Sequence, residues 1–196
     1  MSDSDPRLLG VVLVGGRSSR MGRDKAQLKT PSGRLFLDLA YDRLQELCDT
    51  VGVSGSQTSR SEYMSIADPP ESHGPISGIY ASLVFATLHG FDACVLNPVD
   101  TPDLTACEMR KMVDVFRQNP SQVVCAVAGE NARHVEPLIA VYPTDITPRI
   151  LDSLNAGQYS LQRILHDLPV IRVPLSVAAC HNVNTPADLN NLTSDE

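Results

Sequence analysis

The chain has no tryptophan, and only four phenylalanines and five tyrosines stand among its 196 residues. Proteins that bind single-stranded nucleic acid stack bases on aromatic side chains, so this composition argues against such a surface. No apolar run approaches the roughly 20 residues of a membrane-spanning helix. The first six residues, MSDSDP, lack the basic and apolar regions of a signal peptide. We therefore expect a cytoplasmic protein whose partners include neither nucleic acid nor a membrane.

The five cysteines are scattered, and no two of them form a Cys-x-x-Cys pair. That spacing would have indicated a zinc site or a redox motif. We expect reduced, buried thiols at all five positions, namely Cys48, Cys94, Cys107, Cys125 and Cys180. A Gly-x-Ser-x-Gly sequence is also absent, which disfavours a serine hydrolase.

The chain does have an acidic balance, with a formal net charge of −7, and a cluster of cations in one glycine-rich loop. Residues 13–25 read LVGGRSSRMGRDK and continue an apolar run that predicts a buried strand. Glycine lets the backbone approach a ligand and present its N–H groups. Arginine and lysine beside such a backbone bind several negative charges. The loop therefore predicts a site for a small polyanionic ligand such as a nucleoside triphosphate, rather than for a nucleic acid.

Two familiar phosphate-binding motifs do not match this loop. A Walker A loop has four residues between its glycines and then Lys and Ser or Thr, whereas five residues separate Gly16 from Gly22, and Arg23 follows. The dinucleotide fingerprint requires Gly-x-Gly-x-x-Gly, whereas Gly15 and Gly16 are adjacent. A different kind of triphosphate loop and a basic surface turn remain as alternatives.

Short apolar runs alternate with amphipathic segments along the chain. We expect strands at residues 8–14, 51–54, 63–67, 93–99, 122–128, 135–141, 170–173 and 178–183. We expect helices at residues 35–48 and 76–88, and further helices after a capping box at Thr105 and after Thr185 and Pro186. This alternation predicts an α/β fold with a mainly parallel, doubly wound sheet. The length suits a single domain over residues 1–196.

In such a sheet, ligands bind beyond the carboxyl ends of the strands. The residues with useful chemistry follow predicted strands: Ser54, Asp68, Asp100, Asn182 and Asn184. Asp100 suits a Mg²⁺ ion that arrives with a triphosphate, because Mg²⁺ takes one or two carboxylates besides phosphates and waters. The spacing alone leaves open that Asp100 is a capping or turn residue.

Asp68 and the glycines after it form a second candidate region. A carboxylate can accept two N–H bonds from the edge of guanine, although Asp68 could equally be a turn residue before two prolines. Pro75 predicts the start of a helix, and Gly74 and Gly78 would let a ligand lie close to that start. Helix packing alone could also account for Gly78.

Together these motifs resemble the molybdenum cofactor guanylyltransferases, the MobA-like nucleotidyltransferases. The resemblance is carried, in chain order, by residues 13–16 and 19–25, Asp68 before residues 74–78, residues 100–102, residues 136–138 and the NVNTP sequence at residues 182–186. It implies a three-layer Rossmann-like nucleotidyltransferase fold of the glycosyltransferase-A type with a mainly parallel central sheet. It also implies a nucleotide-binding half of about residues 7–105 and an acceptor-binding half of about residues 106–192.

The resemblance implies transfer of GMP from GTP to molybdopterin, with Mg²⁺ as cofactor, to give the guanine dinucleotide cofactor and pyrophosphate. It assigns nucleotide binding to Leu13, Val14, Gly15, Gly16, Lys25, Ser54, Asp68, Gly78 and Asp100. It assigns catalysis to Arg20, Lys25 and Asp100, the metal to Asp100, and molybdopterin to Asn182 and Asn184. A GTP-binding accessory protein and molybdoenzyme chaperones are further candidate partners.

The chain departs from the family pattern at three places. Val14 replaces the usual alanine, and Ser54 stands where the family often has asparagine. The segment at residues 157–160 lacks the arginines that some relatives carry, and Arg163 is the candidate to replace them.

The residues leave two other functions open. One is a related nucleotidyltransferase that uses CTP, or a sugar or lactyl phosphate as acceptor. The other is a non-catalytic carrier of nucleotide or cofactor. Asp68 favours guanine over the first, and Lys25 with Asp100 favours catalysis over the second.

Overall fold

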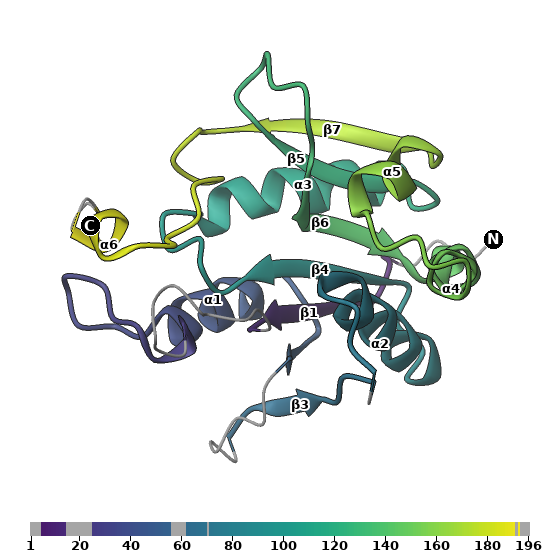
Figure 1. Ribbon diagram of the computed structural model, residues 1–196, viewed down its shortest axis with the longest axis horizontal. Coiled ribbons are helices and arrows are strands. Elements are labelled where there is room, and N and C mark those ends of the chain that lie inside the picture. The colour runs from purple at the N-terminus through teal and green to yellow at the C-terminus, as the bar shows by residue number, and fades with distance from the viewer. Residues whose placement is uncertain (1–4, 15–24, 56–61, 70, 191, 193–196) are drawn as a thin grey trace.

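The computed structural model describes residues 5–14, 25–55, 62–69, 71–190 and 192, and of Lys25 and Pro186 it describes the backbone. These residues form a seven-stranded sheet in the order β3-β2-β1-β4-β6-β5-β7 (Figure 1). The strands are β1 (Leu8–Leu13), β2 (Thr50–Ser54), β3 (Met64–Ile66), β4 (Ala93–Pro98), β5 (Val123–Ala128), β6 (Glu136–Pro143) and β7 (Val170–Leu175).

The sheet is parallel except at β6. Strand β1 pairs in parallel with β2 and β4, β2 with β3, and β5 with β7, whereas β6 is antiparallel to β4 and β5. Two neighbouring parallel strands need a connection of a dozen or more residues, whereas only residues 129–135 connect β5 to β6. The prediction of a mainly parallel sheet is confirmed, and the short connection accounts for the exception.

Helices cover both faces of the sheet (Figure 1). The helices α1 (Phe36–Gln45) and α3 (Ala106–Gln118) share one core cluster with the sheet, and α2 (Pro75–Leu88), α4 (Thr147–Asn155) and α5 (Leu161–His166) share the other. The remaining short elements are η1 (Lys25–Gln27), η2 (Thr144–Ile146) and α6 (Pro186–Asn190). Within the described ranges, no helix is long and apolar enough to cross a membrane.

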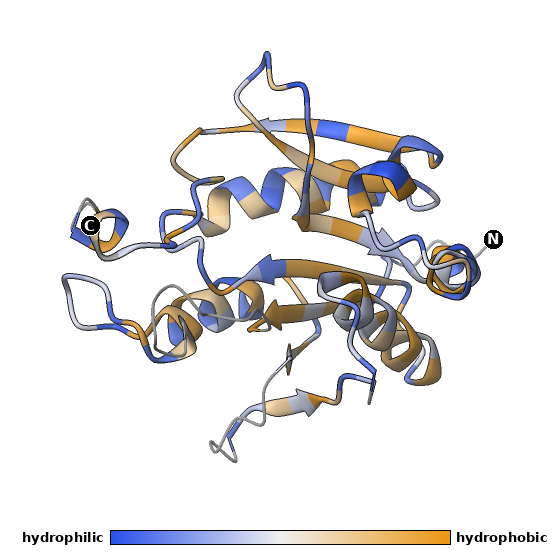
Figure 2. Cartoon of the chain, viewed as in Figure 1, coloured by the Kyte–Doolittle hydropathy of each residue, from blue (hydrophilic) through white to orange (hydrophobic). Residues whose placement is uncertain are grey.

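The sheet residues alternate between these two core clusters. On β1, Val12 packs toward α1 and α3, while Val11 packs toward α2; on β4, Val95 and Leu96 divide in the same way. Figure 2 shows the strands largely in the hydrophobic colour, and α1 and α3 with both hydrophobic and hydrophilic residues. The three-layer arrangement therefore follows from apolar strands buried on both faces.

The strand predicted at residues 178–183 is wrong. Residues 177–180 form a turn, in which His181 N donates to Ala178 O (3.0 Å), and an irregular segment follows. Val183 is nevertheless buried in the core cluster that contains α1 and α3. The apolar pattern of this segment thus reflects burial of a turn and not pairing with a strand.

The expectation that all the cysteines are buried is also wrong. Cys107, at the start of α3, is exposed, and Cys48 is only partly buried. Burial raises the pKa of the thiols of Cys48 and Cys125 to about 12 and that of Cys180 to about 11. These three therefore stay protonated at neutral pH and are poor nucleophiles.

Candidate active site

The carboxyl ends of β1, β2 and β4 meet at one edge of the sheet, and Figure 1 shows the arrowheads of β1 and β4 pointing to the same side. Backbone pairing continues past the strand ends, since Val14 N donates to Ser54 O (2.9 Å) and Val99 N donates to Leu13 O (3.0 Å). Leu13 and Val14 therefore lie between the end of β2 and the end of β4. The predicted binding strand occupies the centre of this edge.

The predicted phosphate loop begins at this point. Gly15, Gly16 and Arg20 lie outside the described residues, as does the side chain of Lys25. The structure does describe the two ends of the loop: β1 leads into it, and η1 follows it with Ala26 buried in the core. The loop thus starts from the carboxyl end of a parallel strand, where a phosphate site is expected.

Four predicted nucleotide-binding residues come together from different elements. Ser54 Oγ donates to Asp68 Oδ1 (2.9 Å). A Cβ atom on Gly78 would lie 3.2 Å from Ser54 Oγ, 3.6 Å from Asp68 Oδ1 and 3.8 Å from Leu13 Cδ2. We refer to Leu13, Ser54, Asp68 and Gly78 as the Ser54 cluster.

Gly78 lies close against the other residues of the Ser54 cluster. Its φ angle is not positive, so the backbone does not require glycine there. Any larger side chain would press on the Ser54 hydroxyl at a distance shorter than ordinary contacts. Asp68 is exposed, and a carboxylate offers about four lone-pair sites, of which Ser54 uses one. The cluster can therefore accept further N–H groups from a planar ligand.

Asp100 follows β4 and is partly buried. Val183 N donates to its backbone oxygen (2.8 Å), which brings the exposed Asn182 and Asn184 beside the residues around Asp100. We call residues 99–102, which follow β4, the Asp100 loop. The structure therefore places Asn182 and Asn184 at the predicted edge, although no strand leads to them.

Two buried polar side chains beneath the Asp100 loop were not predicted. Arg43, on α1, is 7% exposed, and Asn97, on β4, is 0% exposed. Arg43 Nη1 donates to Asn97 Oδ1 (3.3 Å) and Thr101 O (3.3 Å), and Nη2 donates to Pro102 O (2.9 Å). Among the residues that the structure describes, Asn97 Nδ2 has no hydrogen-bond partner.

The sequence did hold a signal for this pair. Asn97 is the one amide within the apolar run at residues 93–99, and Arg43 falls between Ala40 and Leu44 on the apolar face of its helix. Buried polar groups are nearly always paired, so a polar residue at each of two core positions indicates a contact. The local sequence, however, does not indicate that Arg43 and Asn97 contact each other.

A stacked pair links α2 to the connection between α4 and α5. The rings of His73 and Tyr159 lie 4.4 Å apart between centroids, with 3° between their planes. His73 N also donates to Ser77 Oγ (2.9 Å) in the first turn of α2. The segment without the family's arginines therefore lies against the start of the helix that carries Gly78.

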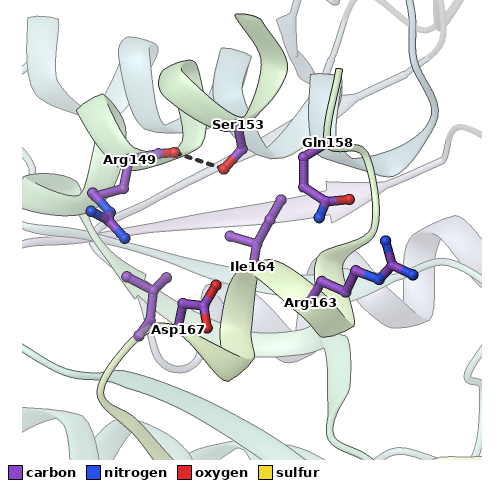
Figure 3. A pocket seen from close by; sticks show the side chains of 7 residues that line it. Arg149, Ser153, Gln158, Arg163, Ile164 and Asp167 are labelled. Atoms are coloured by element: carbon purple, nitrogen blue, oxygen red, sulfur yellow. Dashed lines mark hydrogen bonds between the residues drawn. The ribbon is translucent and has the colours of Figure 1, made fainter. Parts of the chain in front are cut away.

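Arg163 lies elsewhere, in a pocket of about 60 Å³ between α4 and α5 that Arg149, Gln158 and Asp167 also line (Figure 3). Ligand pockets usually measure roughly 300–1,000 Å³, so this one is too small for a nucleotide. Figure 1 shows α4 on the side away from the carboxyl ends of β1 and β4, whereas Gln162 on α5 donates to Val135 O (2.7 Å), just before β6 begins. The role of Arg163 in place of the missing arginines stays a prediction.

The donor groups around Asp100 suit a cation that is shared with phosphate. No group of three or more His, Cys, Asp or Glu side chains that could hold a metal ion exists in the described part of the chain. A closed zinc site needs about four protein ligands, whereas Mg²⁺ bound with a triphosphate needs only one or two carboxylates. A single aspartate at the end of β4 fits the second case.

Glu108 connects α3 to the segment that leads to Asn182. The capping box predicted at Thr105 is confirmed: Glu108 N donates to Thr105 Oγ1 (3.2 Å), and Thr105 N donates to Glu108 Oε2 (3.3 Å). Ser176 N donates to Glu108 Oε1 (3.0 Å). Burial raises the pKa of this carboxyl, but the hydrogen bonds from Ser176 and Thr105 outweigh burial and hold the pKa below its ordinary value.

Residues 10–173 match the family model of the MobA-like NTP transferase domain. The chain belongs to this family. A probable molybdenum cofactor guanylyltransferase of Rhodopirellula baltica is 36% identical over 192 residues, which cover 94% of this chain and 90% of the relative. The family expected from the motifs is confirmed, and the chain is a nucleotidyltransferase.

Solved structures agree on the fold. The molybdopterin-guanine dinucleotide biosynthesis protein A of Archaeoglobus fulgidus superposes with a TM-score of 0.75 at 21% identity, covering 93% of this chain and 95% of that one. A 4-diphosphocytidyl-2C-methyl-D-erythritol synthase of Anaerococcus prevotii superposes with a TM-score of 0.73 at 10% identity, covering 94% and 93%. The predicted nucleotidyltransferase fold is confirmed, and enzymes named for different nucleotides share it, so the fold alone does not select the base.

Proposed function

We propose that this chain transfers GMP from GTP to molybdopterin, forming molybdopterin guanine dinucleotide and releasing pyrophosphate. The name of the Rhodopirellula baltica relative supports this reaction. The observation that carries the proposal is the hydrogen bond from Val183 N to Asp100 O (2.8 Å). It joins the segment with the two asparagines to the Asp100 loop, which is itself bonded to the end of β1. In this proposal, the nucleotide and the acceptor bind at one edge of the sheet.

The two halves of the chain would divide the substrates. In the nucleotide-binding half, residues 7–105, the Ser54 cluster would bind guanine, with Val14 contributing its backbone. Gly15, Gly16, Arg20 and Lys25 would bind the phosphates. In the acceptor-binding half, residues 106–192, Asn182 and Asn184 would bind the pterin. The exposed carboxylate of Asp68 supports guanine, whose edge presents donors, over cytosine.

The chemistry requires positioning and charge neutralisation rather than a base. An oxygen of the terminal phosphate of molybdopterin forms a bond to the α-phosphorus of GTP. The bond from that phosphorus to the bridging oxygen breaks, and pyrophosphate leaves with the electron pair. The attacking phosphate is already ionised, so no residue needs to remove a proton. Lys25 and Arg20 would reduce the repulsion between the two anions.

Asp100 would hold Mg²⁺ with the triphosphate. When bound, this ion would neutralise phosphate charge and stabilise the leaving pyrophosphate. Asp100 would contribute an oxygen ligand beside the segment with Asn182 and Asn184, because its backbone oxygen accepts from Val183 N. We place this reaction in the cytoplasm, with a GTP-binding accessory protein and molybdoenzyme chaperones as the protein partners to test.

The test is pyrophosphate release from purified protein with molybdopterin, Mg²⁺ and each of GTP, CTP, ATP and UTP. We expect release with GTP, and none without molybdopterin or with a chelator. Release with CTP alone would replace the proposal with a cytidylyltransferase. Release with GTP and a sugar phosphate but not with molybdopterin would change the acceptor. Nucleotide binding without any release would indicate a carrier.

A further inference from the structure

The Asp100 loop is supported from below by one buried guanidinium group. Three acceptors that bind Arg43 flank Asp100 in the sequence: Asn97 precedes it by three residues, and the carbonyls of Thr101 and Pro102 follow it. One planar group thus fixes the chain on both sides of the aspartate. A guanidinium is suited to this because its donors lie in a rigid fork.

Arg43 is itself held firmly. It belongs to α1, whose neighbouring side chains Phe36, Ala40 and Leu44 are buried in the core. An arginine in such a position is rare unless it is paired, because a buried charge loses its hydration. An exposed position therefore does not account for an arginine at residue 43, whereas its hydrogen bonds to the Asp100 loop do.

Asn97 gives a second reason to assign a role to this contact. The side chain is fully buried, and Nδ2 has no partner within the described residues. An unpaired buried donor destabilises a fold, so an apolar residue would pack better at this position. The oxygen of the same amide accepts from Arg43 Nη1. The hydrogen bond with Arg43 therefore accounts for an amide at this buried position.

We propose that Arg43 is a positioning residue, which holds Asp100 where it can act as a metal ligand. The inference rests on the proposed function, because it takes Asp100 to bind the cation. The backbone of the loop is bonded to Leu13 on one side and to Val183 on the other, and Arg43 supplies the third support. Small displacements of a reacting group cost large factors in rate. Arg43 acts through Asp100 and holds it within that tolerance.

The test uses the full chain with two replacements, Arg43→Met and Arg43→Lys. Mn²⁺, which accepts the same oxygen ligands as Mg²⁺, is titrated by electron paramagnetic resonance in the presence of GTP. We expect Arg43→Met to weaken Mn²⁺ binding by about tenfold and to lower kcat far more than it raises the KM for GTP. Arg43→Lys keeps the charge but not the fork, so its effect should be intermediate.

The matched control is Leu44→Ala, on the same helix. Leu44 is fully buried against Gly10 of β1, so this change creates a cavity and lowers stability. It should leave Mn²⁺ affinity unchanged. If Arg43→Met lowers the Tm as Leu44→Ala does and leaves Mn²⁺ affinity and kcat at wild-type values, Arg43 is merely structural and the inference is overturned. If Arg43→Met does not fold, the same comparison is made with Arg43→Lys.

Asp100→Asn in the same titration separates this inference from the proposed function. Weaker Mn²⁺ binding with Asp100→Asn and with the Arg43 variants supports both. Weaker binding with Asp100→Asn alone overturns the role of Arg43 and leaves the proposed metal site standing. Unchanged binding with Asp100→Asn overturns the metal site, and the role of Arg43 with it.

Discussion

The Ser54 cluster and the Asp100 loop lie at the same edge of the sheet and are built in opposite ways. The cluster has small residues, one hydrogen bond between side chains and an exposed carboxylate. The loop rests on a buried arginine and is bonded through its backbone to β1 and to Val183. An exposed carboxylate suits recognition of a base, whereas a fixed backbone suits placement of a reacting phosphate. Changes in the cluster should alter which nucleotide is used, and changes in the loop should alter the rate.

The largest effect should come from the loop. Asp100→Asn should lower kcat by about a thousandfold or more at saturating GTP, because the phosphate charge would lose its stabilising cation. The fold should persist, since the hydrogen bond to Val183 uses the backbone oxygen of residue 100. Pyrophosphate release measures the rate, and circular dichroism measures the fold.

Asp114→Asn is the matched control, because it removes the same charge from an exposed position on α3. We expect nearly wild-type turnover from it. Wild-type turnover from Asp100→Asn would refute the metal role and erase the proposed contrast between loop and cluster.

The second-largest effect should come from a change in the Ser54 cluster. Asp68→Asn should lower kcat/KM for GTP by about 10- to 100-fold, since an amide would place a donor against the donors of guanine. The loss should lie in KM, and the preference for GTP over CTP should shrink. Glu71→Gln removes a neighbouring exposed carboxylate and should change neither value. An unchanged GTP preference in Asp68→Asn would show that Asp68 does not read the base.

A smaller effect should follow from adding a methyl group at Gly78. In Gly78→Ala, the new methyl group would push the Ser54 hydroxyl away from Asp68, at a cost of about 1 kcal/mol or roughly fivefold in GTP affinity. Calorimetric titration with GTP measures it. The same substitution in a Ser54→Ala background should have little further effect, because the displaced hydroxyl is gone. Equal losses in both backgrounds would contradict the crowding explanation.

The smallest effect should appear outside both regions, at Glu108. Its pKa is lowered in the folded chain, so its ionised form adds stability above the ordinary glutamate pKa of 4.5, and this stability is lost as the pH falls through the lowered value. Glu108→Gln should cost about 0.5 kcal/mol at neutral pH, because solvent screens a partly exposed group. Urea unfolding should show the difference from wild type shrinking in acid. A difference that is constant with pH would show that ionisation is not involved.

Many residues at the candidate site could be predicted from the sequence, because they directly follow apolar runs. Ser54 and Asp100 come after strands of a parallel sheet, and the carboxyl ends of such strands meet. The segment with Asn182 and Asn184 reached the same edge for a different reason. Its apolar residues are buried in a turn, which gives the same pattern as a short strand.

The supporting contacts could not be predicted in the same way. Arg43 meets Asn97 across 54 positions of the chain, and His73 meets Tyr159 across a longer span. Each residue has an ordinary local explanation, as a helix arginine, a strand amide or a loop aromatic. Local patterns report burial and periodicity, whereas these pairs depend on which helix covers which end of the sheet.

The bond between Val183 N and Asp100 O has a consequence for how such an enzyme can diverge. Every residue except proline supplies a backbone N–H, and every residue supplies a backbone oxygen. The hydrogen bond between the two proposed substrate sites therefore does not depend on which side chains stand at positions 182 and 184. Side chains that contact the acceptor can be exchanged one at a time while the spacing between acceptor and metal ligand is inherited unchanged.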